Sequence, residues 1–352
     1  MNESIQRLYD EDISRIINDD NLDFKVFNNS KILVTGANGL IGHLIIKVLL
    51  KLKESLNIDI YALVRKAEKL RINFSDTELK RINIIESDCR DYKYDGIDYD
   101  YIIHTACPTD SKGMVEHPVD LVDVSFNGTK AMLDLAVKSN SRSFIYLSSM
   151  EVYGLPENDE KIYEDRPLTT RSDVVRNCYP ISKILCENLC ASYTEEFNIS
   201  TDIIRLTQAF GPGVKYEDNR IFSQVAKKII DKDDIVLRTK GETKRNYIYT
   251  ADAVSAIFTV IIKGNHNGDI YNAANENTYC SIVQMCEMAA DHLSDGSTKV
   301  TFALTDDIKK FGYAPTLHMN LSSDKLNSIG WIPRYSLIDM FSRLMEYYKY
   351  IK

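Results

Sequence analysis

Three polar residues in the middle of the chain have the types and the spacing of an acid–base centre. Tyr179 and Lys183 stand four residues apart in a stretch with a helical pattern, so both side chains share one helix face. A tyrosine hydroxyl with its ordinary pKa of about 10 is a poor base at neutral pH, but a nearby ammonium favours the phenolate and lowers that pKa. Ser149, or its neighbour Ser148, closes an apolar strand pattern and can hydrogen-bond a reacting oxygen. The set predicts removal of a proton from an alcohol.

A glycine-rich turn nearer the N-terminus indicates the partner of that chemistry. It joins the apolar run 31–35 to an apolar-rich helical stretch at 40–53. Gly36 permits a tight turn, Gly39 lets the backbone approach a pyrophosphate, and Gly42 allows close packing of helix on strand. The helix N-terminus adds amide donors. With the acid–base centre, the turn predicts hydride transfer between a nicotinamide dinucleotide and an alcohol or ketone carbon. The expected cofactor contacts in the turn are Gly36, Asn38, Gly39, Leu40, Ile41 and Gly42.

The end of the second predicted strand, 58–64, bears on the choice of dinucleotide. An acid that binds the adenosine ribose is usual there, but Val64 takes its place and Arg65 follows. A guanidinium suits a 2′-phosphate, so the sequence slightly favours NADP over NAD; a solvated surface arginine is the alternative interpretation. Asp88, just past the third predicted strand, is expected to accept a hydrogen bond from the adenine amino group, or else to be a surface turn residue.

Strand-like and helix-like stretches alternate along most of the chain, which predicts an α/β fold with a doubly wound parallel Rossmann sheet. Beyond Gly213 the alternation loosens, which predicts a smaller, interleaved C-terminal substrate-binding part. The predicted strands are 31–35, 58–64, 82–86, 101–105, 143–148 and 202–206, with helices at 40–53, 124–139 and 179–197. The expected division is an acidic helical extension at 1–29, a cofactor-binding domain at 30–206 and 244–262, and a substrate-binding part at 207–243 and 263–352.

Composition excludes several classes of protein. The formal net charge of −8 argues against a nucleic-acid-binding surface, which would be basic. The seven cysteines form no CxxC pair and no zinc ligand set, so we expect free thiols in a reducing cytoplasm and no metal. No apolar run approaches the roughly 18 residues of a membrane helix, and the polar N-terminus does not read as a signal peptide. We therefore expect a soluble cytoplasmic protein without a membrane or nucleic-acid partner.

These motifs make the chain similar to the extended short-chain dehydrogenase/reductases of the nucleotide-sugar epimerase/dehydratase family. The resemblance implies that Ser149, Tyr179 and Lys183 form a catalytic triad. It covers nearly all of 30–350 and includes the glycine turn, Asp88, the His104-Thr-Ala106 string, 147–154, the Tyr179/Lys183 pair, 205–213, 219–223, 245–252 and 330–333. It also implies further cofactor contacts at Cys89, Thr105 and Ala106, and a nucleotide-diphosphate-sugar site at Gln208, Asn219, Arg220 and Arg245. Relatives usually dimerise through a four-helix bundle that the helix bearing Tyr179 would enter, so a homodimer is expected.

Three departures from the family pattern leave the sugar open. Gln208 replaces the usual asparagine, and Ser125 stands where asparagine is frequent. The Arg-Arg-Pro-Asp string of many relatives is missing, and the segment 314–319 takes its place. The segment 218–254 resembles that of UDP-glucuronate decarboxylase, which is therefore one specific alternative.

The resemblance implies oxidation of the sugar at C4, with Tyr179 taking the hydroxyl proton, and a 4-keto intermediate that acidifies C5. Glu151 lies two residues beyond Ser149, so on a continuing strand both face the same side. It is the candidate base at C5; a structural carboxylate is the alternative. Met150 stands where dTDP-glucose dehydratases have a proton-donating aspartate, which weakens that reaction. Other dehydrations, 4-epimerisation and decarboxylation remain, the last requiring a cation that the sequence does not assign.

Two alternatives lie outside this group of reactions. An NADPH-dependent reductase of a 4-keto sugar would suit Arg65 but leave Glu151 unexplained. A non-catalytic NADP-binding subunit would leave the triad without a purpose. The preferred expectation is an enzyme of surface polysaccharide precursor synthesis.

Overall fold

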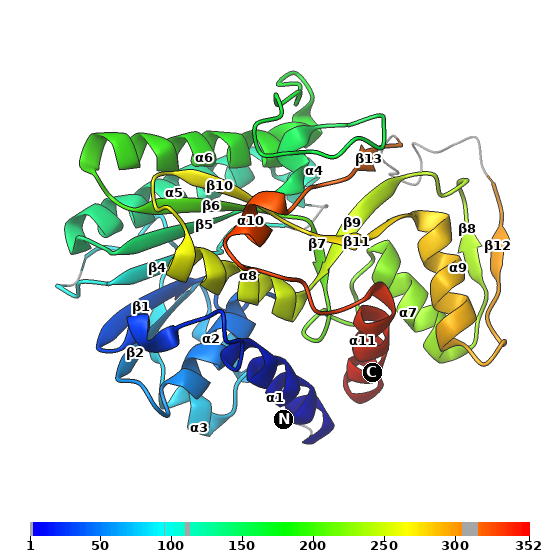
Figure 1. The fold of residues 1–352 in the computed structure, drawn as a ribbon, viewed down its shortest axis with the longest axis horizontal. Helices are drawn as coiled ribbons and strands as arrows, with labels where there is room; N and C mark the ends of the chain where they lie inside the picture. The colour runs from blue at the N-terminus through cyan, green and yellow to red at the C-terminus, as the bar shows by residue number, and fades with distance from the viewer. Residues whose placement is uncertain (1–2, 95, 110–112, 305–315) are drawn as a thin grey trace.

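The computed structural model describes residues 3–94, 96–109, 113–304 and 316–352, so the segment 314–319 begins outside the described residues. Within them, a parallel sheet of seven strands forms the centre of the molecule (Figure 1). In spatial order its strands are β10 (Asp269–Ala273), β6 (Thr201–Leu206), β5 (Ser143–Ser149), β4 (Tyr101–His104), β1 (Ser30–Thr35), β2 (Ile58–Val64) and β3 (Asn83–Glu86). The strand order reverses direction between β1 and β4, and ligands of doubly wound sheets bind beyond the carboxyl ends of the strands at such a point.

Helices cover both faces of this sheet, which explains why its strands are nearly continuous apolar runs. On β1, Ile32 belongs to the core shared with the helices on one face, whereas Leu33 belongs to the core on the other. The first face is covered by α2 (Gly42–Leu52) and α8 (Thr250–Lys263), and the second by α5 (Pro118–Ser139) and α6 (Cys178–Phe197). The doubly wound Rossmann fold predicted from the sequence is confirmed.

A second part of the molecule lies beyond the carboxyl ends of β5 and β6, on the right of Figure 1. Among the described residues it contains a four-stranded and a two-stranded sheet. The strands of the four-stranded sheet are β7 (Gln208–Phe210), β9 (Lys244–Tyr249), β11 (Asn275–Ser281) and β13 (His318–Met319), and those of the two-stranded sheet are β8 (Ile235–Leu237) and β12 (Val300–Phe302). Apart from α8, the described helices that follow Gln208 are α7 (Ile221–Asp231), α9 (Ile282–Leu293), α10 (Asp324–Ser328) and α11 (Leu337–Ile351).

Two strands belong to sheets other than those to which the expected division, with its boundaries at 243/244 and 262/263, assigned them. β9 was expected in the cofactor-binding domain but pairs with β7, β11 and β13. β10 was expected in the substrate-binding part but forms the edge of the large sheet beside β6. Strands this short show no periodicity that names their partner, so the sequence alone does not assign them to a sheet. The division itself stays a prediction.

The remaining elements are short, apart from the N-terminal helix. They are α1 (Glu3–Ile17), α3 (Asp76–Leu79), α4 (Gly113–Glu116), η1 (Phe24–Phe27), η2 (Ala67–Ile72), η3 (Met150–Tyr153) and η4 (Val175–Asn177). Helix α1 packs against α2, α8 and α11, with Leu8, Ile13 and Ile16 buried in the shared core. The described part of the N-terminal extension, residues 3–29, is therefore packed into the fold.

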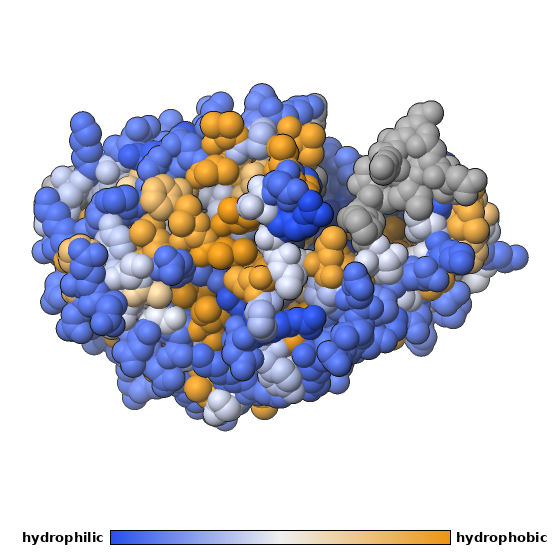
Figure 2. Space-filling model, turned by 90° about the horizontal axis from the view of Figure 1, so that it is seen from above, coloured by the Kyte–Doolittle hydropathy of each residue, from blue (hydrophilic) through white to orange (hydrophobic). Residues whose placement is uncertain are grey.

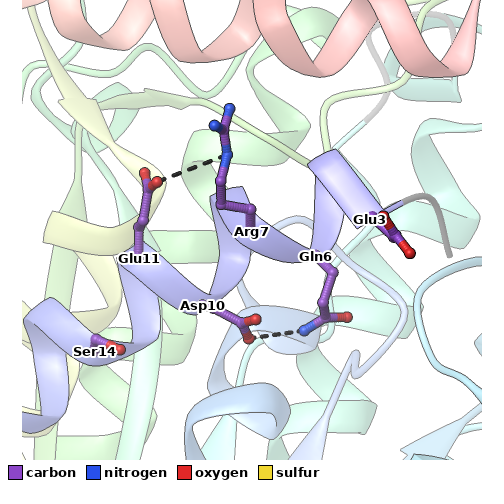
Figure 3. Close-up of a pocket in the computed structure, with 6 residues that line it drawn as sticks. All are labelled: Glu3, Gln6, Arg7, Asp10, Glu11 and Ser14. Atoms are coloured by element: carbon purple, nitrogen blue, oxygen red, sulfur yellow. Dashed lines mark hydrogen bonds and ion pairs between the residues drawn. The ribbon is translucent and has the colours of Figure 1, made fainter.

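The exposed side of α1 carries a shallow groove of about 460 Å³. Figure 3 shows its charged lining, in which Gln6 donates to Asp10 at 2.8 Å and Arg7 lies 3.9 Å from Glu11. None of the site residues predicted from the sequence lines this groove. In the described part of the chain, the helices are too short or too polar to cross a membrane.

Candidate active site

The turn between β1 and α2 has a geometry that only glycine permits at two positions. Gly36 has φ of +68°, and a Cβ there would lie 2.8 Å from Thr105 Oγ1 and 2.9 Å from the amide nitrogen of Ala106. A Cβ on Gly42 would collide with the carbonyl of Gly36. At Gly39 a Cβ would meet only that carbonyl oxygen, at 3.1 Å, so this part of the turn is open to a ligand. The turn is thus tight on its inner side and accessible on its outer side.

The same turn contains a buried hydrogen-bond acceptor without a partner among the described residues, which bears on whether a dinucleotide fits there. Asn38 donates from Nδ2 to the carbonyl of Lys66 at 3.3 Å, but its Oδ1 is buried without a hydrogen-bond partner among the described residues. A buried acceptor left unpaired costs about 1–3 kcal/mol, so it indicates a donor supplied by a ligand. Leu40 and Ile41, which lead into α2, complete the turn beside the free amides of the helix N-terminus. These residues fit a pyrophosphate-bearing cofactor.

Residues expected at the adenosine and nicotinamide ends follow neighbouring strands. Arg65 is exposed directly after β2, and Asp88 and Cys89 follow β3. Thr105 donates from Oγ1 to the carbonyl of Thr35 at 2.7 Å, and the amide of Ala106 donates to Thr35 Oγ1 at 3.2 Å. The carboxyl ends of β1 to β4 therefore gather these side chains at one edge of the sheet.

Asp88 is held by a cation that the sequence analysis did not consider. Its carboxylate accepts hydrogen bonds from the amide, Nε and Nη2 of Arg90 at 3.0 to 3.1 Å. Burial alone would raise the pKa of Asp88, but these bonds hold it below its usual value. Arg90 also pairs with Asp120 and Asp123 at the start of α5. Asp88 is thus an ionised, oriented acceptor.

The candidate catalytic hydroxyls come from β5 and α6. Ser149 is the last residue of β5, and its Oγ accepts from the amide of Glu151 at 3.2 Å. Burial raises the pKa of Tyr179, and Ser149 lies close enough to its hydroxyl to oppose that shift. Ser148 points the other way, since successive strand residues face opposite sides, and donates to Glu187 at 2.5 Å. The structure therefore pairs Tyr179 with Ser149 and not with Ser148.

Lys183 does not act on Tyr179 as the spacing predicted. Its Nζ donates to the carbonyl of Leu147 at 2.7 Å and lies 4.7 Å from the centre of the Tyr146 ring, against 5.8 Å for Tyr179. Burial raises the pKa of Tyr179 far above its ordinary value, and Cys107 raises it further. The expected lowering of this pKa is therefore wrong for the protein in this structure, because burial outweighs a lysine that is turned to a backbone carbonyl. Tyr179 is a neutral hydroxyl here.

Glu151 lies near Tyr179, but not for the reason expected. β5 ends at Ser149 and Glu151 belongs to η3, so the argument from strand alternation is wrong. Its charge nevertheless reaches Tyr179, whose raised pKa is due first to burial and in part to Glu151. Glu151 Oε2 lies 3.5 Å from Nη1 of Arg176, a residue that the sequence analysis missed. The sequence offered one signal for Arg176, namely its place directly ahead of the helix that bears Tyr179.

Met150 is turned away from this site. It is 8% exposed, and its sulfur accepts a hydrogen bond from Thr207 Oγ1 at 3.3 Å inside a hydrophobic cluster. The position that carries a proton donor in one group of relatives therefore holds a core side chain.

The predicted substrate contacts lie in two places. Gln208 on β7 and Arg245 on β9 are paired, with Arg245 Nη1 donating to Gln208 Oε1 at 3.2 Å. Arg245 Nε is buried without a partner among the described residues, which indicates an acceptor supplied by a ligand. Asn219 and Arg220 are exposed at the start of α7, and Arg220 forms a bidentate pair with Asp218. The described residues contain no cluster of His, Cys, Asp and Glu that could hold a metal.

Solved structures with this fold include nucleotide-sugar epimerases. The chain aligns over 92% of its length with 99% of the UDP-N-acetylglucosamine 4-epimerase from Methanobrevibacter ruminantium, with a TM-score of 0.77 and 19% identity. The dTDP-glucose 4,6-dehydratase DesIV from Streptomyces venezuelae, solved with NAD bound, aligns with a TM-score of 0.73 and 21% identity, over 91% of this chain and 97% of that chain. These likenesses show the fold.

Curated relatives carry out two of the reactions considered above. A dTDP-D-glucose 4,6-dehydratase from Dictyostelium discoideum is 27% identical to this chain. The match covers 70% of this chain and 58% of the relative's length. UDP-glucuronic acid decarboxylase 1 from Arabidopsis thaliana is 26% identical over 90% of this chain and 69% of the relative. The family model described as the NAD dependent epimerase/dehydratase family matches residues 32–274, more than half of the chain. The chain therefore belongs to the NAD-dependent epimerase/dehydratase family.

Proposed function

We propose that this protein oxidises C4 of a nucleotide-diphosphate sugar with a bound nicotinamide dinucleotide. The observation that carries the proposal is the place of Ser149 at the carboxyl end of β5, close enough to the Tyr179 hydroxyl on α6 to act on it. The cofactor, when bound, accepts a hydride. Tyr179 must first lose its own proton; as the phenolate it accepts the proton of the C4 hydroxyl, while Ser149 orients that hydroxyl. Lys183 has three ammonium donors and gives one to Leu147, so the others are available to a ribose hydroxyl.

The substrate-binding residues support a diphosphate-bearing ligand. Arg245 is half-buried and has a buried Nε that is unpaired among the described residues, and Gln208 accepts a hydrogen bond from its guanidinium. Arginine matches phosphate oxygens with its planar set of donors. Arg220 and Asn219 are proposed contacts from the start of α7, with Arg220 turning from Asp218 to the ligand. The solved relatives include one with UDP-glucose and one with UDP-glucuronic acid and NAD, by their descriptions.

Decarboxylation or epimerisation is the favoured step after oxidation, with UDP-glucuronate decarboxylation as the specific second candidate. Met150 is packed in the core, so its position supplies no proton to a leaving hydroxyl. A β-keto acid loses carbon dioxide without such a donor. Several curated relatives are UDP-glucuronic acid decarboxylases. A 4-keto-sugar reductase and a non-catalytic NADP-binding subunit are disfavoured by Glu151 and by the triad, respectively.

The cofactor and the assembly are further proposals. Exposed Arg65, close enough to act on the charge of Asp88, supports NADP slightly over NAD.

Figure 2 shows apolar side chains gathered on the side of the molecule that bears α4, α5 and α6, where Val115, Val119 and Leu185 are exposed. We propose that two copies of the protein form a homodimer through this face. We further propose that the protein acts in the cytoplasm, in the synthesis of polysaccharide precursors. Replacement of Val119, which is 81% exposed, by glutamate should give a monomer in sedimentation experiments.

Incubation with a panel of nucleotide sugars and NAD or NADP, read by mass spectrometry, tests the reaction. Loss of carbon dioxide, loss of water and unchanged mass with a new stereoisomer separate decarboxylation, dehydration and epimerisation. Net consumption of NADPH would identify a reductase. No conversion of any nucleotide sugar with either cofactor would contradict the proposal.

A further inference from the structure

Arg176 places a positive charge at the reacting end of the site. It belongs to η4 (Val175–Asn177), the turn that leads directly into α6 and Tyr179. Its Nη1 lies 3.5 Å from Glu151 Oε2. Burial dominates the raised pKa of Tyr179, Glu151 adds to the shift and Arg176 opposes it. Both charges therefore lie close enough to the Tyr179 hydroxyl to act on it, and on a group bound there.

The pair of Arg176 with Glu151 is loose. The two side chains are 41% and 38% exposed, and the contact is longer than a charge-assisted hydrogen bond. Exposed ion pairs of this kind contribute little to stability, so rearrangement costs little. A guanidinium has five N–H donors, and a single contact with Glu151 leaves most of them for another carboxylate. Arg176 is thus held near the site but keeps its capacity to bind an anion.

The other two cations considered at the site are assigned to other groups of the ligands. Lys183 donates to the carbonyl of Leu147 and is 3% exposed. Arg245 donates to Gln208 on the four-stranded sheet. Neither combines exposure with a place beside Glu151. The cation that decarboxylation requires, which the sequence did not assign, has a candidate in Arg176.

Sugar chemistry fixes which substrate group meets Arg176. With the C4 hydroxyl on Tyr179, the neighbouring carbon C5 and its substituent C6 lie beside that hydroxyl. We place the C5 side of the sugar, and not the C3 side, next to Glu151 and Arg176, which lie 3.5 Å apart beside Tyr179. A neutral hydroxymethyl group would use neither charge. A carboxylate would be repelled by Glu151 unless a cation lay between the two.

We propose that Arg176 bridges Glu151 and the C6 carboxylate of a uronic acid, and so selects acidic nucleotide sugars over neutral ones. The inference rests on the proposed function, because it takes the C4 hydroxyl to bind at Tyr179. It assigns Arg176 as a specificity-determining residue, and it applies to decarboxylation and to epimerisation of the uronic acid alike.

Binding to a catalytically silent variant tests this selection without turnover. The probes are UDP-glucuronate, UDP-glucose and their dTDP counterparts, titrated by calorimetry into Tyr179→Phe in the presence of NAD or NADP. We expect the acidic sugar of a pair to bind about ten- to a hundredfold more tightly than the neutral one. Arg176→Gln in the same background should remove this preference and leave the affinity for the neutral sugar unchanged. Arg176→Lys should restore part of it.

Arg171→Gln is the matched control. It removes the same charge from the same segment, but Arg171 pairs with Asp173 and is 72% exposed. The preference for the acidic sugar should survive this change. Equal affinities for acidic and neutral sugars in the parent, or an equal loss of both on Arg176→Gln, would overturn the inference. Turnover of any of these sugars by Tyr179→Phe would instead overturn the proposed function, and the two failures are therefore distinguishable.

Discussion

Glu151 is the residue whose chemistry separates the steps that follow oxidation. If it is the base at C5, Glu151→Gln keeps the shape of the side chain, and the backbone bond from its amide to Ser149 remains. We expect C4 oxidation to continue and reduced cofactor to accumulate, because the intermediate no longer proceeds. Exchange of the C5 hydrogen with deuterated solvent should fall by about 10²–10⁴-fold, as for loss of a general base. Mass spectrometry of the recovered sugar measures this exchange.

The wild type supplies the control for that measurement. Of the three reactions only dehydration breaks the C5–H bond. The product of a plain 4-epimerase would carry no solvent deuterium, and a decarboxylase would place one deuterium on C5 in place of the carboxylate while keeping the original hydrogen. Deuterium-free product from the wild type, or undiminished exchange in Glu151→Gln, would rule out Glu151 as the base at C5.

Arg65 should set the preference between the two dinucleotides. Removal of a charge-assisted contact to a 2′-phosphate costs about 1.5–3 kcal/mol, or about ten- to a hundredfold in affinity. We expect Arg65→Ala to weaken NADP binding by this factor and to leave NAD binding nearly unchanged, as measured by calorimetry. Arg71→Ala, which removes an exposed arginine paired with Asp76, is the control. Equal wild-type affinities for NAD and NADP, unaffected by Arg65→Ala, would refute the assignment.

At the scale of residues, the spacing of residues in the sequence predicted where side chains lie better than it predicted their protonation. The four-residue spacing put Tyr179 and Lys183 on one helix, and α6 does carry both. It did not predict that burial would raise the pKa of Tyr179, since burial is a property of the assembled core. Arg176 was missed for a similar reason. Its partner Glu151 lies on η3, and only the fold brings η3 and η4 together.

Among the elements, α1 is the one whose role the sequence left open, and a buried carboxylate explains why it is fixed. Asp12 accepts hydrogen bonds from the hydroxyls of Tyr249 and Tyr335 and from Arg343, each at 2.8 Å. Tyr249 lies on β9, Tyr335 lies in the segment ahead of α11, and Arg343 lies on α11. The N-terminal helix thus ties together strands and helices from both parts of the chain.

The Asp12 contacts predict a pH dependence of stability. Burial raises the pKa of Asp12 to about 6, although Arg343 and the tyrosine hydroxyls oppose the shift. Because the folded pKa lies above the unfolded one, Asp12 favours folding most at low pH and loses that contribution as pH rises through about 6. The free energy of unfolding of the wild type relative to Asp12→Asn should therefore be larger at pH 4 than at pH 7, by up to about 3 kcal/mol.

Urea denaturation of both proteins at several pH values measures the difference. Asp10→Asn, on the exposed side of the same helix, is the control, because it removes one carboxylate from α1 without touching the Asp12 contacts. A difference between wild type and Asp12→Asn that narrows as pH falls would contradict the sign of the argument.

Elements with long apolar runs were predicted well, and those with short runs were not. β2 has the predicted bounds, 58–64, because all of its residues except the exposed Asp59 are apolar or aromatic, as in a strand covered on both faces. β13 spans only His318–Met319 and owes its existence to pairing with β9, a contact between residues far apart in sequence. The strand expected to continue through Glu151 ended at Ser149, because η3 begins there with Ser149 capping the turn.

At the scale of the whole molecule, the site is assembled from two sheets. Tyr179 and Ser149 belong to the layer of the large parallel sheet, whereas Gln208 and Arg245 belong to the four-stranded sheet. The sequence predicted the first sheet and with it the edge where a dinucleotide binds. It did not predict the second, since strands of two to seven residues with mixed polarity have no distinct pattern.

The central claim is that Tyr179 is the acid–base group for oxidation at C4. Tyr179→Phe removes one hydroxyl from a buried side chain, so the fold and the cofactor site should be retained. On the sugar identified by the panel, we expect turnover to fall by at least about 10²–10⁴-fold while the dinucleotide binds with unchanged affinity. Steady-state rates and cofactor titration of the same preparation give both values. Wild-type turnover by Tyr179→Phe on that sugar would contradict the account.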